Sequence, residues 1–106
     1  MNLPDAVRAY FDADQSADAK ALIGAFSETA VVRDEGATYE GLEPIRLWWL
    51  EAKRKYSHRA EPISVTGDGN GISVLATVSG NFPNSPAQLG FRFVLEKGTI
   101  SELEIG

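Results

Sequence analysis

The length, composition and charge of the chain exclude several classes of protein. Its 106 residues predict a single domain, residues 1–106, with one core and room for one pocket. With no cysteine and one histidine, neither disulfides nor a thiolate or histidine metal cluster can form, and we expect no metal and no cofactor. The net charge of −5 argues against a nucleic-acid partner, because phosphates are bound mainly by lysine and arginine. No segment approaches the roughly 20 apolar residues of a membrane span, and the N-terminus does not resemble a signal peptide, so we expect a cytoplasmic protein without membrane contact.

Two helices and a short strand are predicted first. Residues 4–14 show helical spacing, and Pro4 suits a first helical turn. The residues that recur at that spacing are Leu3, Val7, Tyr10 or Phe11, and Asp14. Residues 16–26 predict a second helix, capped by Ser16 or Asp18. Its apolar stripe is Leu22, Ala25 and Phe26. Residues 30–34 then predict a short strand.

The rest of the chain predicts one more helix and an antiparallel meander. Residues 39–56 return to helical spacing, and we expect this third helix to be well buried. The residues of its apolar face are Leu42, Ile45, Trp48, Trp49, Ala52 and Tyr56. From residue 60 the period becomes two, with strands around 63–66, 72–82, 89–95 and 99–105 separated by glycine- or proline-rich turns. The predicted fold is therefore α+β, with helices on one face of an antiparallel sheet and the order α-α-β-α-β-β-β-β.

Asp34 at the end of the first strand is the main candidate for chemistry. Alternation places it on the same face as Ala30 and Val32, which suggests an inward carboxyl, but Val31 on the other face is equally apolar. Both orientations remain open from periodicity alone.

The remaining candidates each have an ordinary structural explanation. Tyr10 can be an amphipathic aromatic of the first helix. The basic residues 53–59 suit a helix C-terminus, and His58 within them is expected to be exposed. Among the aromatics, Trp48, Trp49, Phe82, Phe91 and Phe93 can simply form the core.

Four stretches of the sequence carry a family resemblance. They are AYFDADQSAD, AFSETAVVRD, YEGLEPIR and GFRFVLEKGTISELEI, and together with the element order they span nearly the whole chain. The chain resembles the nuclear transport factor 2-like superfamily and, within it, the SnoaL-like and ketosteroid-isomerase-like small-molecule proteins. The resemblance implies a curved sheet wrapped around helices into a cone (a cystatin-like fold), an apolar pocket, and a homodimer formed through the outer face of the sheet.

The resemblance also implies roles for individual residues. Tyr10, eight residues before Asp18, matches a tyrosine that holds the substrate oxygen, and Asp34, sixteen residues after Asp18, matches the aspartate that moves the proton. An inward Asp34 is therefore expected. The implied pocket walls, where an apolar ligand would bind, are Val32, Trp48, Trp49, Phe82, Leu89, Phe91 and Phe93.

Leu89 departs from the isomerase pattern. The ketosteroid isomerases carry a second, protonated acid at this position, and losing one oxyanion donor costs roughly 3 to 4 kcal/mol of transition-state stabilisation. A steroid isomerase is therefore not expected. Three functions remain: an isomerase, cyclase or hydratase that uses Asp34 and Tyr10 on an apolar carbonyl substrate; a non-catalytic binder of an apolar ligand; and a dimeric interaction module.

Overall fold

The computed structural model describes the backbone of residues 1–106 and every side chain except that of Asp68. Its elements in chain order are α1 (Asp5–Ser16), α2 (Ala19–Gly24), β1 (Phe26–Asp34), β2 (Ala37–Glu40), α3 (Leu42–Tyr56), β3 (Arg59–Asp68), β4 (Gly71–Ser79), β5 (Ala87–Glu96) and β6 (Thr99–Ile105). The predicted α+β class and the order of helices and strands are confirmed, and the structure adds one short strand, β2.

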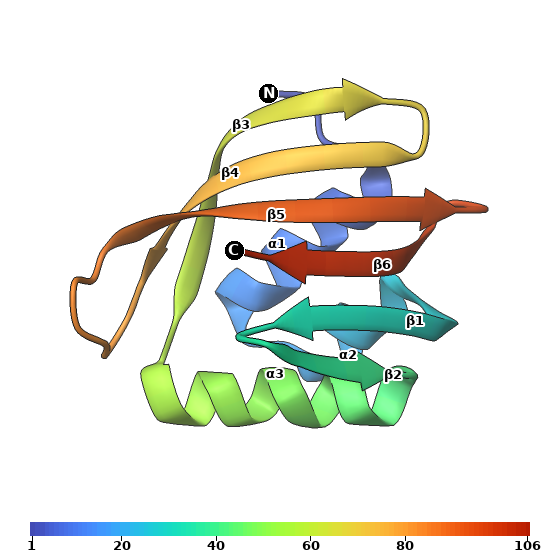
Figure 1. Ribbon diagram of the computed structural model, residues 1–106. Helices are drawn as coiled ribbons and strands as arrows, with labels where there is room; N and C mark the ends of the chain where they lie inside the picture. Colours follow the sequence, from blue (N-terminus) through green and yellow to red (C-terminus); the bar gives the residue numbers. More distant parts are fainter.

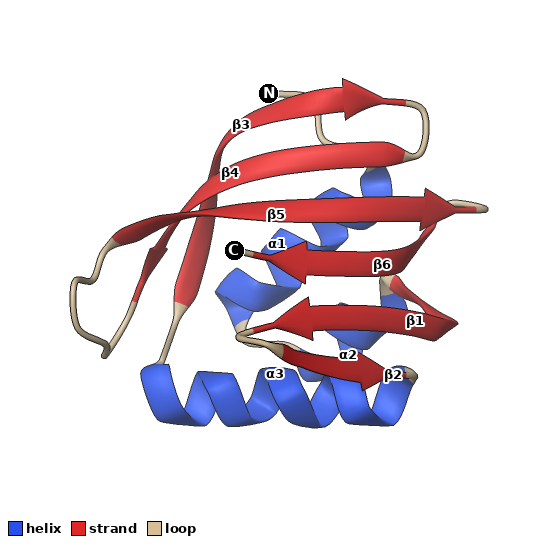
Figure 2. Ribbon diagram, viewed as in Figure 1, coloured by secondary structure: helices blue, strands red, loops and turns tan.

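The strands form a single curved sheet in the order β2-β1-β6-β5-β4-β3. Neighbouring strands run antiparallel except β1 and β6, which are parallel. Figure 1 shows α1 and α2 behind the sheet, with β3 and β4 bending toward the C-terminal end of α3. Figure 2 shows the same separation by colour, with α1 and α2 behind the strands and α3 along the edge of the sheet beside β2. The sheet therefore curves around its helical side, as in a cone.

Aromatic rings fix α1 against the inner face of the sheet. Tyr10 meets Phe93 edge to face with ring centroids 5.6 Å apart, and Phe11 meets Phe91 at 5.3 Å. Such pairs contribute roughly 0.5–1.5 kcal/mol beyond the burial of their area. Alternation on β4 and β5 turns these rings and the small aliphatic side chains of β4 inward. The packing therefore sets where the Tyr10 side chain lies.

The added strand β2 forms because the chain turns tightly after Asp34. Glu35 and Gly36 both have positive φ, +52° and +78°, as a two-residue hairpin turn requires, and Asp34 then pairs with Ala37. Residues 39 and 40, predicted as the start of the third helix, lie in this strand, and α3 begins at Leu42. The predicted exposed turn at Glu35 and Gly36 is confirmed.

Two other predictions need correction. The second helix ends at Gly24, and Phe26 begins β1 instead of completing the helical stripe. The third helix is less buried than expected: of its apolar face only Ile45 and Trp49 are fully buried, because α3 lies along one end of the sheet rather than inside it. For the second helix, the predicted cap is confirmed, since the Asp18 carboxylate accepts a hydrogen bond of 3.1 Å from the Ala21 amide.

The segment between β4 and β5 is tied to the end of α3. The Asn81 amide donates to the Tyr56 carbonyl at 2.6 Å, and the Gly80 amide donates to the Ser85 hydroxyl at 3.0 Å. This loop is therefore held beside the C-terminal end of α3. None of the helices in the described part of the chain combines the length and hydropathy that crossing a membrane would require.

Candidate functional site

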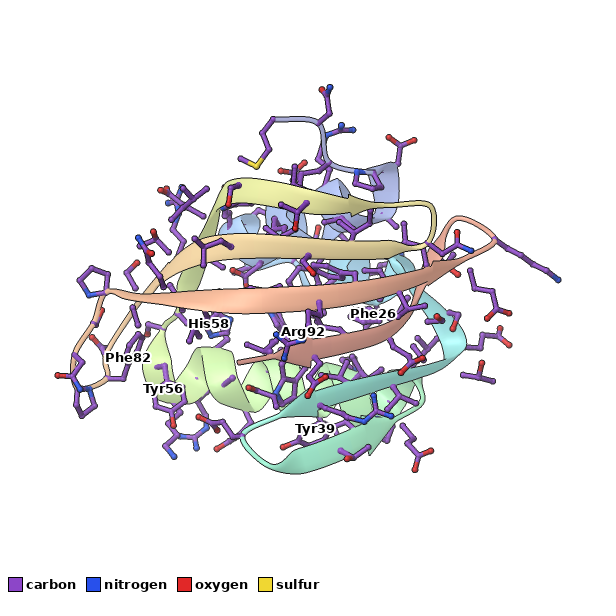
Figure 3. The ribbon with its side chains drawn as sticks, turned by 45° about the horizontal axis from the view of Figure 1, so that its top comes forward. Phe26, Tyr39, Tyr56, His58, Phe82 and Arg92 are labelled. Carbon is purple, nitrogen blue, oxygen red and sulfur yellow. The ribbon has the colours of Figure 1, made fainter. Side chains whose placement is uncertain are left out.

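A cavity of about 940 Å³ lies between the inner face of the sheet, α1 and α3. Its deeper wall contains Tyr10, Asp14, His58, Ala60, Val78 and Phe91. Its outer part contains Asp34, Tyr39, Trp48, Tyr56, Phe82 and Leu89, with exposed side chains such as Glu35, Leu47 and Lys55 at the mouth. Tyr56, His58 and Phe82 gather at the C-terminal end of α3 (Figure 3), where the rings of Tyr56 and Phe82 meet edge to face at 6.0 Å. The volume is that of a small-molecule site.

Asp34 lies on the cavity wall, as the inward orientation requires. Ala30 and Val32, which precede it on the same face of β1, are fully buried, and the Asp34 side chain is half-buried. The indole nitrogen of Trp48 donates to Asp34 Oδ2 at 3.1 Å. Burial raises the pKa of Asp34; the Trp48 hydrogen bond opposes this shift, the nearby Glu35 charge adds to it, and the net pKa is raised. Asp34 can therefore carry or accept a proton closer to neutral pH than an ordinary aspartate.

Tyr10 lines the same cavity from α1. The residue is only 2% exposed, and its ring is held among Phe11, Phe26 and Phe93. Burial, followed by the charges of Asp14 and Asp34, raises its pKa well above the ordinary range of tyrosine. The hydroxyl therefore keeps its proton and can act as a hydrogen-bond donor beside Asp34.

The structure separates the predicted apolar binding residues into two groups. Trp48, Phe82, Leu89 and Phe91 line the cavity. The others, Val32, Trp49 and Phe93, are buried in the core and are not part of the cavity wall. Val32 pairs with Leu103 across β1 and β6, Trp49 turns its indole nitrogen to Asp14, and Phe93 stacks beside Phe91.

Leu89 places an apolar side chain on the wall where the isomerase pattern has an acid. It is half-buried on β5, opposite Ala76 of β4. The sheet side of the cavity near Leu89 and Phe91 is therefore apolar. The carboxylates and the imidazole nearest to the inner wall are Asp34 of β1, Asp14 of α1 and His58 of the link between α3 and β3.

A cluster around Asp14 also faces the cavity, and it was missed from the sequence. Asp14 is 1% exposed and accepts hydrogen bonds from Trp49 Nε1 at 2.9 Å, from His58 Nε2 at 2.8 Å and from the Ala60 amide at 3.1 Å, while Lys53 Nζ lies 3.3 Å from its carboxylate. Burial, the largest single influence, would raise the pKa of Asp14, but the bond and charge of His58, the Trp49 bond and the Lys53 charge together lower it. Asp14 is therefore an ionised carboxylate inside the fold.

The expectation that His58 is exposed was wrong. Its side chain is 16% exposed, because the ring lies against the buried Asp14 carboxylate, with Nε2 2.8 Å from Oδ1. Lys53, expected only to face the helix C-terminus, donates to the backbone carbonyls of Asp14 and His58. The signal available in the sequence was Asp14 itself, a carboxylate on the apolar stripe of the first helix, where a buried charge needs partners.

Elsewhere in the described chain, no three histidine, aspartate or glutamate side chains are grouped as a metal site would need.

Comparisons of the sequence and of the structure with known proteins agree on one family. Residues 7–102 match the model of the SnoaL-like domain. The structure of the Sinorhizobium meliloti protein SMa1630, provisionally assigned as a polyketide cyclase, is 47% identical, covers 98% of this chain and 95% of its own, and superposes with a TM-score of 0.96. No curated protein matches the sequence significantly.

More distant structures share the fold. A Catenulispora acidiphila protein with a ketosteroid isomerase-like fold, solved with trimethylamine, is 18% identical over 99% of this chain and 86% of its own, with a TM-score of 0.87. A cystatin-fold protein from Novosphingobium aromaticivorans is 16% identical over 100% of this chain and 98% of its own, with a TM-score of 0.83.

Proposed function

Because the chain belongs to the SnoaL-like domain family, within the nuclear transport factor 2-like fold, we propose that its cavity binds an apolar carbonyl compound and catalyses proton transfer on it. Asp34 is the general acid and base, and the Tyr10 hydroxyl holds the substrate oxygen. The observation that carries this proposal is a half-buried carboxylate with a raised pKa on the wall of a largely apolar cavity.

The proposed step begins at a carbon next to the carbonyl group. The ionised Asp34 carboxylate takes the proton from that carbon, and the electron pair of the broken C–H bond moves to the carbonyl oxygen. The Tyr10 hydroxyl donates a hydrogen bond to the enolate oxygen so formed. Positioned proton transfer of this kind contributes roughly a hundredfold to ten-thousandfold in rate.

Among the reactions that start in this way, ring closure has additional support. Isomerisation, aldol-type cyclisation and hydration or dehydration all suit a single carboxylate beside a hydroxyl donor. The Sinorhizobium meliloti protein, 47% identical, carries a provisional polyketide cyclase assignment. Aldol-type closure is therefore the form of the reaction that we favour.

A general-base probe tests the proposal without knowledge of the natural substrate. In 5-nitrobenzisoxazole, a base removes the carbon-bound proton, the electron pair forms a nitrile, and the N–O bond breaks to give a coloured phenolate. We expect the protein to accelerate this elimination and Asp34→Asn to lose at least about a hundredfold of the rate. The matched control is Asp12→Asn, an exposed aspartate of α1, which should leave the rate unchanged. Equal rates for the Asp34→Asn variant and the unchanged protein would contradict the role of Asp34.

A non-catalytic ligand binder is the alternative, and Leu89 favours it. The wall there has no acid to complete an oxyanion site of the isomerase kind. The two functions differ in what Asp34→Asn does to 2-naphthol binding, read from the fluorescence of Trp48 on the cavity wall. In an enzyme, the isosteric variant loses turnover and keeps affinity; in a binder that uses the carboxylate, it loses affinity.

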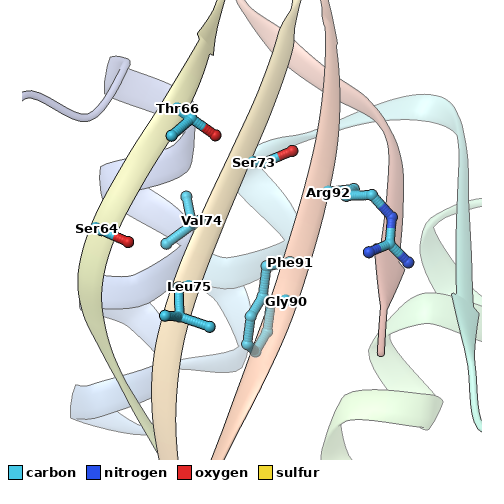
Figure 4. A pocket seen from close by; sticks show the side chains of 8 residues that line it. All are labelled: Ser64, Thr66, Ser73, Val74, Leu75, Gly90, Phe91 and Arg92. Atoms are coloured by element: carbon cyan, nitrogen blue, oxygen red, sulfur yellow. The ribbon is translucent and has the colours of Figure 1, made fainter.

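We further propose that the protein acts as a cytoplasmic homodimer of single-domain protomers, paired through the outer face of the sheet. Leu75 and Val94 face outward from β4 and β5 and are 38% and 40% exposed. Figure 4 shows the neighbouring shallow groove of about 190 Å³, whose lining residues on β4 and β5 include Leu75, Gly90 and Arg92. A sheet face with exposed aliphatic side chains suits a second copy of the chain.

A further inference from the structure

The Asp14 cluster determines which nitrogen of His58 carries a hydrogen. Trp49 Nε1, the Ala60 amide and the Lys53 ammonium are donors beside the Asp14 carboxylate, and His58 Nε2 lies 2.8 Å from Asp14 Oδ1. An ionised carboxylate can only accept, so His58 Nε2 must carry a hydrogen whether the ring is neutral or charged. The nitrogen that gains and loses a proton is therefore Nδ1.

The ring is also held in position. The backbone carbonyl of His58 accepts from Lys53, and the ring meets Trp49 edge to face with centroids 6.4 Å apart. His58 nevertheless lines the cavity that contains Asp34 and Tyr10. We propose that His58 is a second acid-base residue of this cavity, with Asp14 as its positioning residue and Nδ1 as the atom that exchanges a proton with the bound molecule.

Charged groups from three elements act on this ring. Asp14 of α1 and Lys53 of α3 lie on its Nε2 and carbonyl sides, and Asp34 of β1 lines the same cavity as the ring. The charge of His58 acts in turn on Asp34, where it lowers the pKa against the stronger effect of burial. The two proton carriers are therefore coupled through a shared cavity.

This inference rests on the proposed function, and it narrows the substrate class to apolar compounds with two carbonyl groups. Asp34 takes a proton from the carbon next to one carbonyl, and the electron pair released forms a carbon–carbon bond to the carbon of the second carbonyl. The oxygen of that second carbonyl then takes the proton from protonated His58 Nδ1, so the ring becomes neutral and a hydroxyl group forms. Two carriers on different elements suit two proton transfers at different atoms.

The state of the ring can be read without any ligand, because the chain contains a single histidine. We expect two-bond ¹H–¹⁵N spectra, recorded at a pH where the ring is neutral, to show the hydrogen on Nε2 and a bare Nδ1. In Asp14→Asn, checked for folding by circular dichroism, the preference for this tautomer should be lost. A neutral ring protonated on Nδ1 in the unchanged protein would overturn the inference.

The access of Nδ1 to the cavity is tested with 2-bromoacetophenone, an apolar aromatic ketone. The imidazole lone pair attacks the CH₂ carbon, a carbon–nitrogen bond forms and bromide leaves, and the chain has no cysteine to compete. We expect an adduct on His58 Nδ1 that forms roughly tenfold faster than with N-acetylhistidine, because the cavity concentrates the ketone beside the ring. Acetophenone should protect against it, and His58→Gln should yield no adduct at this position.

The outcomes separate the two claims. If acetophenone changes the tryptophan fluorescence but His58 reacts no faster than N-acetylhistidine, or reacts at Nε2, the inference fails and the proposed function stands. If acetophenone neither binds nor protects and no residue of the cavity is alkylated, both fail.

Discussion

The two aspartates that face the cavity have opposite electrostatic environments. At Asp14 the bond and charge of His58, the Trp49 bond and the Lys53 charge outweigh burial and lower the pKa, whereas at Asp34 burial outweighs the Trp48 bond and raises the pKa. Asp14 therefore stays charged, and Asp34 is the carboxyl to which the proposed function assigns proton exchange. Two carboxyl groups whose pKa values are pushed in opposite directions indicate a structural role for one and a chemical role for the other.

These opposite shifts predict opposite effects on stability. A lowered pKa in the folded state stabilises the fold above the unfolded pKa, and this contribution is lost as the pH falls through the folded value. Asp14→Asn should therefore lower the free energy of unfolding at pH 7 by about 3–5 kcal/mol, as expected when one partner of a buried charge cluster is removed. Urea denaturation measures the change, and Asp12→Asn on the same helix should stay within roughly 0.5 kcal/mol of the unchanged protein.

For Asp34 the sign is reversed. A raised pKa in the folded state stabilises the fold below the unfolded pKa, and this contribution is lost as the pH rises through the folded value. At pH 7 the charged side chain therefore lowers the free energy of unfolding. Asp34→Asn should raise the Tm by roughly 1–4 °C, since about 1 kcal/mol moves the Tm of a domain this size by several degrees. The gain should shrink as the pH falls and vanish below about pH 3, where the carboxyl is protonated in both states. A Tm that falls at pH 7 would show that Asp34 stabilises the fold.

The sequence predicted one part of the candidate site and missed another. The family resemblance placed Asp34 and Tyr10 at the cavity, whereas strand alternation alone left the orientation of Asp34 open and helical spacing gave Tyr10 only a packing role. The pairing of Asp14 with His58 could not be predicted, since the two residues are 44 positions apart in the sequence and meet only after β3 folds back along α1. A lone histidine in a basic run carries no sign of the partner that buries it.

At the scale of elements, the opening of the cavity depends on the close approach of the β4–β5 loop to the end of α3. Gly80, after β4, packs against the end of α3, and a Cβ at this position would lie 2.6 Å from the Tyr56 carbonyl oxygen and 3.1 Å from the His58 Cα. Both neighbours are backbone atoms that cannot rotate away. The glycine therefore lets the β4–β5 loop close onto the segment that carries His58.

Gly80→Ala should consequently push the loop away from α3. We expect a loss of about 1–3 kcal/mol in the free energy of unfolding, as for other overpacked sites, together with weaker 2-naphthol binding. Gly24→Ala is the matched control, because a Cβ there meets nothing within 4 Å and alanine favours the helical backbone of α2 by up to about 1 kcal/mol. Equal stability changes in the two variants would mean that the contact with α3 does not hold the loop.

The elements themselves were largely predictable, and the exceptions have local causes. One-sided alternation identified β4 and β5, and helical spacing identified α1 and α3. β2 was missed because the range predicted for the following helix began at residue 39 and overlapped this four-residue strand. The positive φ angles of Glu35 and Gly36 turn the chain back before that helix begins. The early end of α2 reflects Phe26, whose side chain packs in the core as part of β1.

At the scale of the whole molecule, the helices cover one face of the sheet and leave the other open. We expect sedimentation at micromolar concentration to show a dimer, and Leu75→Lys to shift it to a monomer, because an interface core does not tolerate an unpaired charge. Ala21→Lys is the control, since Ala21 is exposed on α2 on the helical side of the sheet. A monomer in the unchanged protein would contradict the proposed interface.

The central claim is that the Asp34 carboxylate acts as a base inside the cavity, and the pH dependence of 5-nitrobenzisoxazole elimination tests it most directly. The difference in rate between the unchanged protein and Asp34→Asn should rise with pH in a single step, because only the ionised carboxylate accepts the proton. The midpoint should lie above the usual aspartate range of about 3.9, as the buried environment requires. A difference of zero at every pH would contradict the account, and so would a step at or below that range.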